Sequence, residues 1–579
     1  MRALLLHPED SPRRGPWAAE RWDLLIDLGK SSAYSEASWA AQYRCPVFRN
    51  SSFRQGIEDV KQTRLTLSAG RGRMVGRAGI DWWELWSLTI AQPALTVLSL
   101  SRMVREIKTP VELWATRPGW PATAVAALTG QPLRSFHDDR LVRLAAQAMR
   151  SVGILRRFSA AEISGIALDK YDAGYWWRSR LALRPRPHAE PVVLVPSAYG
   201  NVSRGAAEYG RLLPRQQFLM VATRRSAKHA SLPPNMDTRD LGAYAEANPS
   251  SDELRSMLAE WRQLRTHLLT SGEMGILAQT GMLDSFPDWL RNGLRVREAW
   301  SAVLDREPVC AVLCGDDSNP YTRMPVLLAT TRKIPTLDFH HGALDGRYLL
   351  KDLPCDLYLA KSEMERDYLV RVCGLPAERL AMGAPQGTLA QGPAGLGEKS
   401  CAVFFSEPYE SAGMRAEEVY REILPELCRL ARENRRTVII KLHPFESRAQ
   451  RQRMVSEILP PDLHRITALV DGPLTKELLS KAWFGLTLES TAAMDCRKAG
   501  VCCFLCSWLV LSPFGYAEQY ARYGIGELLS GADELSRIPD RLQSLGNCTR
   551  TTPLSEPLDP VLFEAWLKDA HQPLGMRSV

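Results

Sequence analysis

The chain has 579 residues, of which 45% are hydrophobic and 24% charged, and its formal net charge is +8. This length predicts two to four domains, and the balanced composition excludes a disordered chain. The longest apolar runs fall far short of the roughly 20 residues that span a bilayer, which excludes a transmembrane helix. The dispersed arginines exclude a nucleic-acid-binding stripe, while the positive charge suits a phosphorylated donor, an anionic glycan or the anionic inner membrane leaflet.

Residues 1–185 are expected to form an α/β region whose role the sequence does not reveal. The first aliphatic run, Ala3–Leu6, is too short for a secretory signal, so the protein is expected in the cytoplasm, with peripheral inner-membrane contact allowed. Trp82, Trp83 and Trp86 lie in a helical pattern, and we expect them to pack internally rather than to stack on sugars. The pattern predicts strands over residues 3–6, 24–28, 46–48 and 111–115, and helices over 82–107 and 147–180.

Residues 186–395 are expected to form a Rossmann-like domain on the acceptor side. The segment Leu183–His188 has two prolines, which block a helix and cannot donate to a sheet, and it therefore predicts a linker. Apolar runs predict strands over 191–197, 217–221, 309–314, 336–339 and 357–360. The Gly-, Pro- and Ala-rich segment Gln386–Gly397 predicts the next domain boundary.

Residues 396–579 are expected to form a second Rossmann-like domain, which binds the nucleotide donor. The expected strands cover 402–405, 437–441, 484–487 and 501–505, and the expected helices cover 415–433, 492–498, 533–544 and 562–569, with another beginning near 448. Alternating strands and helices of this kind are typical of parallel α/β layers. The predicted fold class is therefore α/β, with two facing Rossmann-like domains and an additional N-terminal α/β region.

The twelve cysteines are scattered along the chain and do not form a disulfide framework. Cys503 and Cys506 have the spacing of a metal-binding pair, but a second pair with suitable spacing is missing, and the surrounding residues predict a strand. The sequence therefore predicts no metal site.

Candidate phosphate-binding residues follow the predicted strands of the last domain, where ligands of parallel sheets collect. After strand 437–441 come His443 and Pro444, and Lys441 ends the strand itself. One strand–helix unit later, Glu489, Ser490 and Thr491 stand before a predicted helix, where hydroxyls and backbone amides suit a phosphate or simply cap the helix. Ser406, which follows strand 402–405, completes the candidate donor-binding set.

Candidate acid–base residues follow two strands of the middle domain. Asp316 and Asp317 are adjacent, so one is expected to face the cleft as a general base while the other caps the next helix. His340 follows the strand alternation and is expected to be a hydrogen-bonded core residue, which leaves His341 as the better candidate for acid–base chemistry. Gly342 is expected to permit a turn that side-chain-bearing residues resist.

In the segments that carry these candidate residues, the chain resembles the bacterial surface-polysaccharide glycosyltransferases of the GT-B fold. That group includes capsule Kdo transferases, sialyl- and polysialyltransferases and CDP-glycerol glycerophosphotransferases. The resemblance covers roughly residues 190–510. It rests on His340-His341-Gly342, Gly383-Ala384-Pro385, Lys441-Leu442-His443-Pro444, Ser490-Thr491-Ala492-Ala493 and Asp495–Gly500.

The resemblance implies roles for individual residues. In the sialyltransferase-like members an HP motif and a Ser/Thr motif hold the CMP part of the donor, which corresponds here to His443-Pro444 and Ser490-Thr491. An acidic motif supplies the base in those members, whereas the glycerophosphotransferases use a His-Gly motif. The pair Asp316-Asp317 is followed by Ser318 instead of glycine, so the base stays open between these carboxylates and His341.

The sequence thus predicts a glycosyltransferase that moves a sugar from a nucleotide-activated, CMP-linked donor to a surface glycan or lipid-linked acceptor, as in capsule or lipopolysaccharide synthesis. We expect no cofactor and no metal, because the chain's own cations and dipoles can neutralise the leaving nucleotide. Three alternatives remain: a glycerophosphotransferase, a UDP-sugar 2-epimerase, and a non-catalytic glycan-binding scaffold of the same fold.

Overall fold

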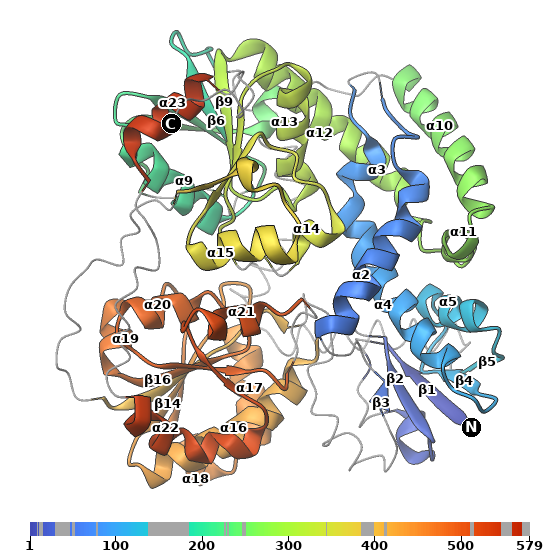
Figure 1. The fold of residues 1–579 in the computed structure, drawn as a ribbon, viewed down its shortest axis with the longest axis vertical. Helices are drawn as coiled ribbons and strands as arrows, with labels where there is room; N and C mark the ends of the chain where they lie inside the picture. Colours follow the sequence, from blue (N-terminus) through green and yellow to red (C-terminus); the bar gives the residue numbers. More distant parts are fainter. Residues whose placement is uncertain are drawn as a thin grey trace. The chain divides into compact units, whose positions relative to one another are not determined.

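A computed structural model of the chain shows an α/β protein with three parallel sheets (Figure 1). It describes residues 1–7, 10, 15–28, 47–48, 53–76, 79–136, 185–224, 227, 231–245, 251–342, 344, 346–383, 399–409, 414–509, 514–545 and 558–569. The helix expected over 147–180 and the boundary expected over 386–397 lie outside these residues. Among the described helices, none is long and apolar enough to cross a bilayer.

The N-terminal region contains a five-stranded parallel sheet with the order β3-β2-β1-β4-β5. Its apolar strand residues pack against an aromatic cluster that includes Trp17, Trp22 and Trp114. The strands are β1 (Arg2–Leu6), β2 (Leu24–Asp27), β3 (Val47–Phe48), β4 (Glu112–Ala115) and β5 (Leu133–Ser135). The helices are η1 (Pro16–Ala19), α2 (Phe53–Leu67), η2 (Ser68–Gly70), α3 (Trp82–Leu85), α4 (Ser87–Arg105) and α5 (Trp120–Thr129).

The tryptophans in α3 and directly after it are packing residues, as the sequence predicts. Trp82, Trp83 and Trp86 are all buried. Their partners lie on a helix of the middle domain, α12 (Phe286–Arg306): the Trp83 ring centroid is 5.7 Å from that of Phe286, and Trp86 stacks on Trp289 at 5.5 Å. The segment around α3 therefore packs with the middle domain, whereas the sequence placed it in the N-terminal region.

The middle domain is built on a seven-stranded parallel sheet with the order β12-β11-β10-β9-β6-β7-β8. Residues 192–197 of an interior strand, β6, are all buried, as expected for a strand covered by helices on both faces. The strands are β6 (Val192–Ser197), β7 (Gln217–Ala222), β8 (Met236–Asp240), β9 (Val309–Cys314), β10 (Thr336–Asp338), β11 (Leu357–Ala360) and β12 (Leu380–Met382).

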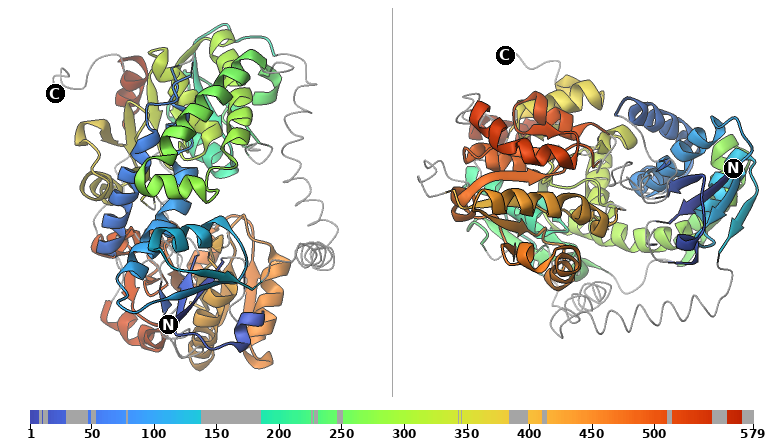
Figure 2. Two further views of the ribbon diagram at one scale, coloured as in Figure 1. Left: turned by 90° about the vertical axis from the view of Figure 1, so that its right-hand side faces the viewer. Right: turned by 90° about the horizontal axis from the view of Figure 1, so that it is seen from below.

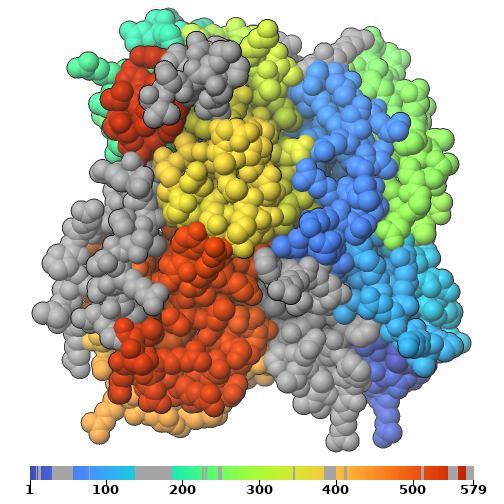
Figure 3. All heavy atoms as spheres, in the orientation of Figure 1, coloured from blue at the N-terminus to red at the C-terminus, as the bar shows by residue number. Residues whose placement is uncertain are grey.

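Helices cover both faces of this middle sheet (Figures 1 and 2). One face carries α9 (Gly200–Leu212), and α13 (Pro320–Thr331) also contacts β6 and β9. In the space-filling view the yellow segment with α14 and α15 forms a continuous part of the surface (Figure 3). The other helices are η4 (Leu241–Tyr244), α10 (Ser251–Leu269), α11 (Gly272–Gln279), α12, α14 (Arg347–Leu350), α15 (Glu363–Asp367), η5 (Tyr368–Val372) and η6 (Ala377–Arg379).

The last domain contains a six-stranded parallel sheet with the order β15-β14-β13-β16-β17-β18. The strands are β13 (Cys401–Phe405), β14 (Thr437–Lys441), β15 (Thr467–Val470), β16 (Ala482–Thr487), β17 (Cys503–Cys506) and β18 (Glu527–Leu529). The helices are α16 (Ala416–Glu433), α17 (Arg448–Ile458), α18 (Pro461–His464), α19 (Lys476–Lys481), α20 (Ala492–Lys498), α21 (Tyr516–Arg522), η8 (Ala532–Arg537) and α22 (Ile538–Leu545). Cys503 and Cys506 lie in a buried strand, as expected.

The final described helix, α23 (Pro560–Asp569), packs on the middle sheet. Phe563 and Leu567 are buried in the same core as Val193 and Leu313, and the Phe563 ring is 5.4 Å from that of Tyr209. The sequence placed this helix in the last domain, because an amphipathic pattern shows that a helix has an apolar face but not which sheet covers it.

The expected fold class is confirmed, because all three sheets are parallel and their strands alternate with helices. The chain forms two compact units. The first unit comprises residues 1–63, 92–166 and 389–552, and the second comprises residues 64–91, 167–388 and 553–579. The middle sheet thus belongs to one unit, and the N-terminal and last sheets belong to the other.

Candidate functional site

The first candidate site lies at the carboxyl ends of β9 and β10 in the middle domain. Gly315 directly follows β9, and a Cβ atom there would lie 2.7 Å from both Phe339 and Val202, so the position has no room for a side chain. This close packing brings the backbone of Gly315 next to the loop after β10. It also places Asp316 at the carboxyl edge of the sheet, where its Oδ1 accepts a hydrogen bond from the amide of Ser318 at 3.0 Å.

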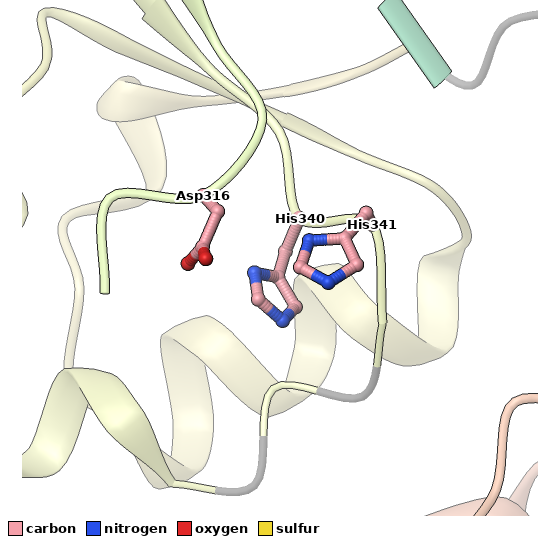
Figure 4. Close-up of side chains that lie close together, drawn as sticks. All are labelled: Asp316, His340 and His341. Atoms are coloured by element: carbon pink, nitrogen blue, oxygen red, sulfur yellow. The ribbon is translucent and has the colours of Figure 1, made fainter. Parts of the chain in front are cut away.

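Asp316, His340 and His341 come together at this edge. Each offers one ligand or proton-transfer atom, and these atoms all lie within 4.8 Å of one another. Figure 4 shows the two imidazoles side by side and the carboxylate of Asp316 facing the ring of His340. The sequence predicted two of these three residues as functional, and the structure joins His340 to them.

The hydrogen bonding of His341 identifies its tautomer. Its Nδ1 lies 3.1 Å from the carbonyl oxygen of Gly315, which can only accept, so Nδ1 carries the proton and Nε2 offers a lone pair. Burial lowers the pKa of His341, while the carboxylate of Asp316 acts in the opposite direction. His341 is therefore a neutral imidazole at pH 7 that can accept a proton at Nε2.

His340 differs from the hydrogen-bonded core histidine that the sequence predicts. It is 2% exposed, and its Nε2 has no hydrogen-bond partner among the described residues. Burial, the largest cause, lowers the pKa of His340 well below its ordinary value, and the cations of Arg347 and Lys361 act in the same direction. The ring is consequently neutral, with an unpartnered nitrogen inside the protein.

Gly342 does not adopt the left-handed backbone conformation that the sequence suggested, since its φ is not in the positive range. A Cβ atom at this position would instead lie 3.6 Å from Nε2 of His340. Nζ of Lys361 donates to the carbonyl oxygen of Gly342 at 2.6 Å and holds the loop from the adjacent strand. A Cβ at 3.6 Å is in ordinary van der Waals contact, so this backbone position does not require glycine.

Asp317 lies apart from Asp316, in a buried ion cluster. It pairs with Lys351 and with Nη1 of Arg323 at 3.2 Å, and it is 1% exposed. Burial acts to raise the pKa of Asp317, but the two cations outweigh it and hold that pKa below its ordinary value. We predicted that one of the adjacent carboxylates caps the next helix. That prediction is wrong, because the N-cap of α13 is Asn319, whose side chain accepts from the amide of Tyr321 at 2.9 Å.

A second carboxyl group in this cluster, Asp338, is arranged to hold a proton. The hydroxyl of Tyr348 lies 3.1 Å from Asp317 and 3.0 Å from Asp338, but it has only one proton to donate. A proton on Asp338 supplies the missing donor, in agreement with a pKa that burial and the charge of Asp317 raise well above its ordinary value. The buried cluster therefore engages Asp317 and Asp338, whereas Asp316 and His341 interact with the loop backbone at the edge of the sheet.

The second candidate site follows β14 in the last domain. The amide of His443 donates to Oε2 of Glu446 at 2.7 Å, and Nδ1 of His443 accepts from the amide of Phe445 at 3.2 Å. Because an amide can only donate, Nδ1 is the acceptor, and the proton of the neutral ring is on Nε2. His443 therefore presents a hydrogen-bond donor, the opposite arrangement to that of His341.

Two of the predicted donor-binding side chains are engaged inside the protein. Nζ of Lys441 donates to the carbonyl oxygens of Leu442 at 2.9 Å and Gly472 at 2.6 Å, and burial lowers its pKa. The hydroxyl of Ser406 donates to Oε1 of Glu446 at 2.7 Å and lies 2.9 Å from the hydroxyl of Tyr420. In this arrangement both side chains shape the loop that carries His443.

The turn after β16 is organised by a carboxylate that the sequence did not single out, Glu407. Oε1 of Glu407 accepts from the hydroxyl of Thr487 at 3.0 Å and from the amides of Leu488 at 3.2 Å and Glu489 at 3.0 Å. It thus takes the amides at the start of the turn. The hydroxyl of Ser490 accepts from the amide of Ala492 at 3.2 Å, whereas the side chain of Thr491 caps no helix amide.

Sequence reasoning missed Glu407 and Glu446, which hold these two loops. Each is an acidic residue just after a strand, next to or near a residue that was singled out, and such residues are usually solvated. Glu446 also pairs with Nε of Arg451 at 2.7 Å, and both side chains are almost fully buried. The only sequence signal is the position of each carboxylate at the carboxyl edge of a parallel sheet.

Glu407 predicts a pH-dependent stability of the last domain. Burial raises the pKa of Glu407 from 4.5 to about 7, so the folded state binds a proton that the unfolded state releases. The stabilisation is fully present below pH 4.5 and is lost as the pH rises through about 7. Replacing Glu407→Gln, which keeps an oxygen acceptor for the three donors, should remove this loss. Thermal unfolding at pH 5 and pH 8 should show a smaller decrease in Tm for the variant, and equal decreases would contradict the assignment.

Comparisons with known proteins concern the architecture. No protein-family model matches the chain, and no curated protein matches its sequence. It resembles the UDP-GlcNAc 2-epimerase of Methanocaldococcus jannaschii in complex with UDP-GlcNAc and UDP, at 12% identity over 65% of this chain and 99% of that one, with a TM-score of 0.41. It also resembles a spinosyn rhamnosyltransferase complexed with thymidine diphosphate, at 14% identity over 66% and 96% of the two chains, with a TM-score of 0.36. At these values the proposals for this chain rest on its own residues.

Proposed function

We propose that the protein is a glycosyltransferase that moves a sugar from a nucleotide-activated, CMP-linked donor to a surface glycan or lipid-linked acceptor. The observation that carries the proposal is the opposite tautomers of two histidines at the carboxyl ends of parallel strands. His443 presents a donor at Nε2, and His341 presents an acceptor at Nε2. Group transfer needs both functions, since the leaving phosphate must be stabilised and the acceptor hydroxyl must lose a proton.

In the last domain, the donor nucleotide binds beside His443-Pro444 and Ser490-Thr491. Nε2 of His443 donates to a phosphate oxygen, and the hydroxyl of Thr491, which caps no amide, is a second donor. Lys441 and Ser406 act through the loops that they hold, and Glu489 contributes its backbone amide to the turn that carries Ser490 and Thr491. This charge stabilisation needs no protein-bound cofactor.

In the middle domain, His341 is the base for the acceptor hydroxyl. Its Nδ1–H is fixed by the carbonyl oxygen of Gly315, and the nearby carboxylate of Asp316 stabilises the imidazolium that forms when Nε2 takes the proton. Asp317 does not act as the base, because its carboxylate is paired with Lys351 and Arg323 in the buried ion cluster.

The nucleotide preference tests the donor half of this proposal. We expect CMP to raise the Tm of the full-length protein, since a ligand that binds only the folded state stabilises it. His443→Ala should abolish that increase, and His464→Ala, a change in the same domain outside the proposed site, should keep it. Absence of a shift with any nucleotide would favour the non-catalytic scaffold.

Thermal shifts with other nucleotides, together with turnover measurements, separate the proposed transferase from the alternative enzymes. Turnover of CDP-glycerol would identify a glycerophosphotransferase. Stabilisation by UDP alone, with isomerisation of a UDP-sugar, would identify a 2-epimerase. Release of CMP from a CMP-sugar in the presence of a glycan acceptor is the outcome that supports the proposal.

A further inference from the structure

The cluster of Asp316, His340 and His341 has the composition of a metal site. Among the described residues, they form one group of three potential metal ligands. Their ligand atoms all lie within 4.8 Å of one another. A zinc ion held at about 2.1 Å by three such ligands separates them by about 3.3 Å. The three groups stand on two adjacent loops, after β9 and after β10, and metal binding requires them to move closer together than they lie here.

His340 provides the independent evidence for a ligand. It is 2% exposed, and its Nε2 has no hydrogen-bond partner in the described part of the chain. A buried polar nitrogen without a partner is unusual in a folded protein. Figure 4 shows its ring between the carboxylate of Asp316 and the ring of His341, so it lies at the centre of the group.

His341 is already arranged as a metal ligand. Its Nδ1–H donates to the carbonyl oxygen of Gly315, which orients the ring and directs the lone pair of Nε2 away from that carbonyl. Metal-binding histidines are commonly oriented by such a bond from the other ring nitrogen. Gly342 places its backbone beside the same nitrogen, since a Cβ at that position would be in van der Waals contact with Nε2 of His340, at 3.6 Å.

We propose that Asp316, His340 and His341 bind one divalent transition-metal ion of the zinc type, with at least one coordination position open. Two neutral imidazoles and one carboxylate are the donor set of open zinc and iron(II) sites. Calcium and magnesium prefer oxygen ligands alone, which this cluster does not provide. The sequence predicted no metal site from its cysteines and did not consider these three residues together, since His340 was expected to be a core residue.

The surrounding charges identify the competitor of the metal. Nη1 of Arg347 lies 3.7 Å from Oδ1 of Asp316, so its guanidinium shares the carboxylate with any bound cation. Lys361 is engaged by the carbonyl oxygen of Gly342 and lies 3.4 Å from Glu365, and Lys351 pairs with Asp317. Removal of the Arg347 charge should therefore tighten metal binding.

One consequence rests on the proposed function. The metal takes the same Nε2 of His341 that accepts the proton of the acceptor hydroxyl. Zinc should therefore suppress transfer, and a chelator should restore it.

Binding of Zn²⁺ alone to the full-length protein, stripped of metals with a chelator, tests the site without any substrate. We expect the protein to bind one equivalent of Zn²⁺ in competition with a fluorescent zinc chelator. Bound Co²⁺ should give the visible absorption of nitrogen–oxygen coordination. His340→Gln should weaken binding by more than about tenfold. His267→Gln, in the same domain but outside the cluster, should leave the affinity unchanged.

Arg347→Gln makes the test independent of folding damage, because the expected result is a gain in zinc affinity, which a misfolded variant would not show. The proposal is overturned if one equivalent is not bound, or if His340→Gln binds zinc as tightly as the wild type. The CMP-induced increase in Tm is measured on metal-free protein, so its absence would reject the proposed function and leave the zinc result standing.

Discussion

Replacing Lys351→Met is expected to lower the free energy of unfolding by about 3 kcal/mol, as is usual when one partner of a buried ion pair is removed. Lys351 is fully buried, and its partner Asp317 is 1% exposed. Methionine fills similar space but leaves Asp317 with a single paired cation, Arg323, whose guanidinium also pairs with Glu84 at 2.7 Å. Urea unfolding followed by tryptophan fluorescence should show the loss, since several tryptophans are buried in this unit.

Two controls separate the lost ion pair from a general effect of the substitution. The double variant Lys351→Met with Asp317→Asn removes both charges and should recover part of the loss, because the uncompensated carboxylate is gone. Lys568→Met breaks an exposed pair with Glu564 on α23 and should change the stability by less than about 0.5 kcal/mol. The single variant Asp317→Asn completes the comparison. If the double variant loses as much stability as Lys351→Met and Asp317→Asn lose together, the buried charge pair is rejected.

The strands that sequence analysis found are mostly the central ones, and those that it missed lie at sheet edges. β5, β8, β12, β15 and β18 were all missed, and each is the last strand on one side of its sheet. Central strands such as Val192–Ser197 are buried on both faces and read as continuous apolar runs. Edge strands are short and mix polar with apolar residues, so their sequences show no clear alternation of apolar residues. In Met236–Asp240, for example, two of the residues are exposed.

The sequence predicted which residues of the candidate site follow the strands, but not which side chains contact them. Asp316 and His341 were found because residues that follow parallel strands gather at one edge. The unpartnered Nε2 of His340 was missed, because alternation along a strand predicts burial but cannot show whether a buried nitrogen has a partner. Lys351 was missed as well, since its pairing with Asp317 depends on contact between segments 34 residues apart in the chain.

His341→Gln is expected to reduce kcat for sugar transfer by about 10²–10⁴-fold, the usual contribution of a general base. Glutamine approximates the size of the ring and can still donate to the carbonyl oxygen of Gly315, but it cannot take the proton of an acceptor hydroxyl. The increase in Tm caused by CMP should persist, because the proposed nucleotide contacts come from His443, Ser490 and Thr491. Release of CMP from a CMP-sugar, followed with excess chelator so that bound metal has no influence, measures the loss.

Asp316→Asn discriminates between the two candidate bases. Loss of its charge should reduce kcat less than His341→Gln does, since the carboxylate only stabilises the imidazolium that His341 forms. The same difference should appear in the pH profile, because the asparagine variant retains the titrating imidazole and the glutamine variant does not. A larger loss in Asp316→Asn, with near-normal turnover in His341→Gln, would move the base to Asp316 and leave His341 as a residue that orients the loop after β10.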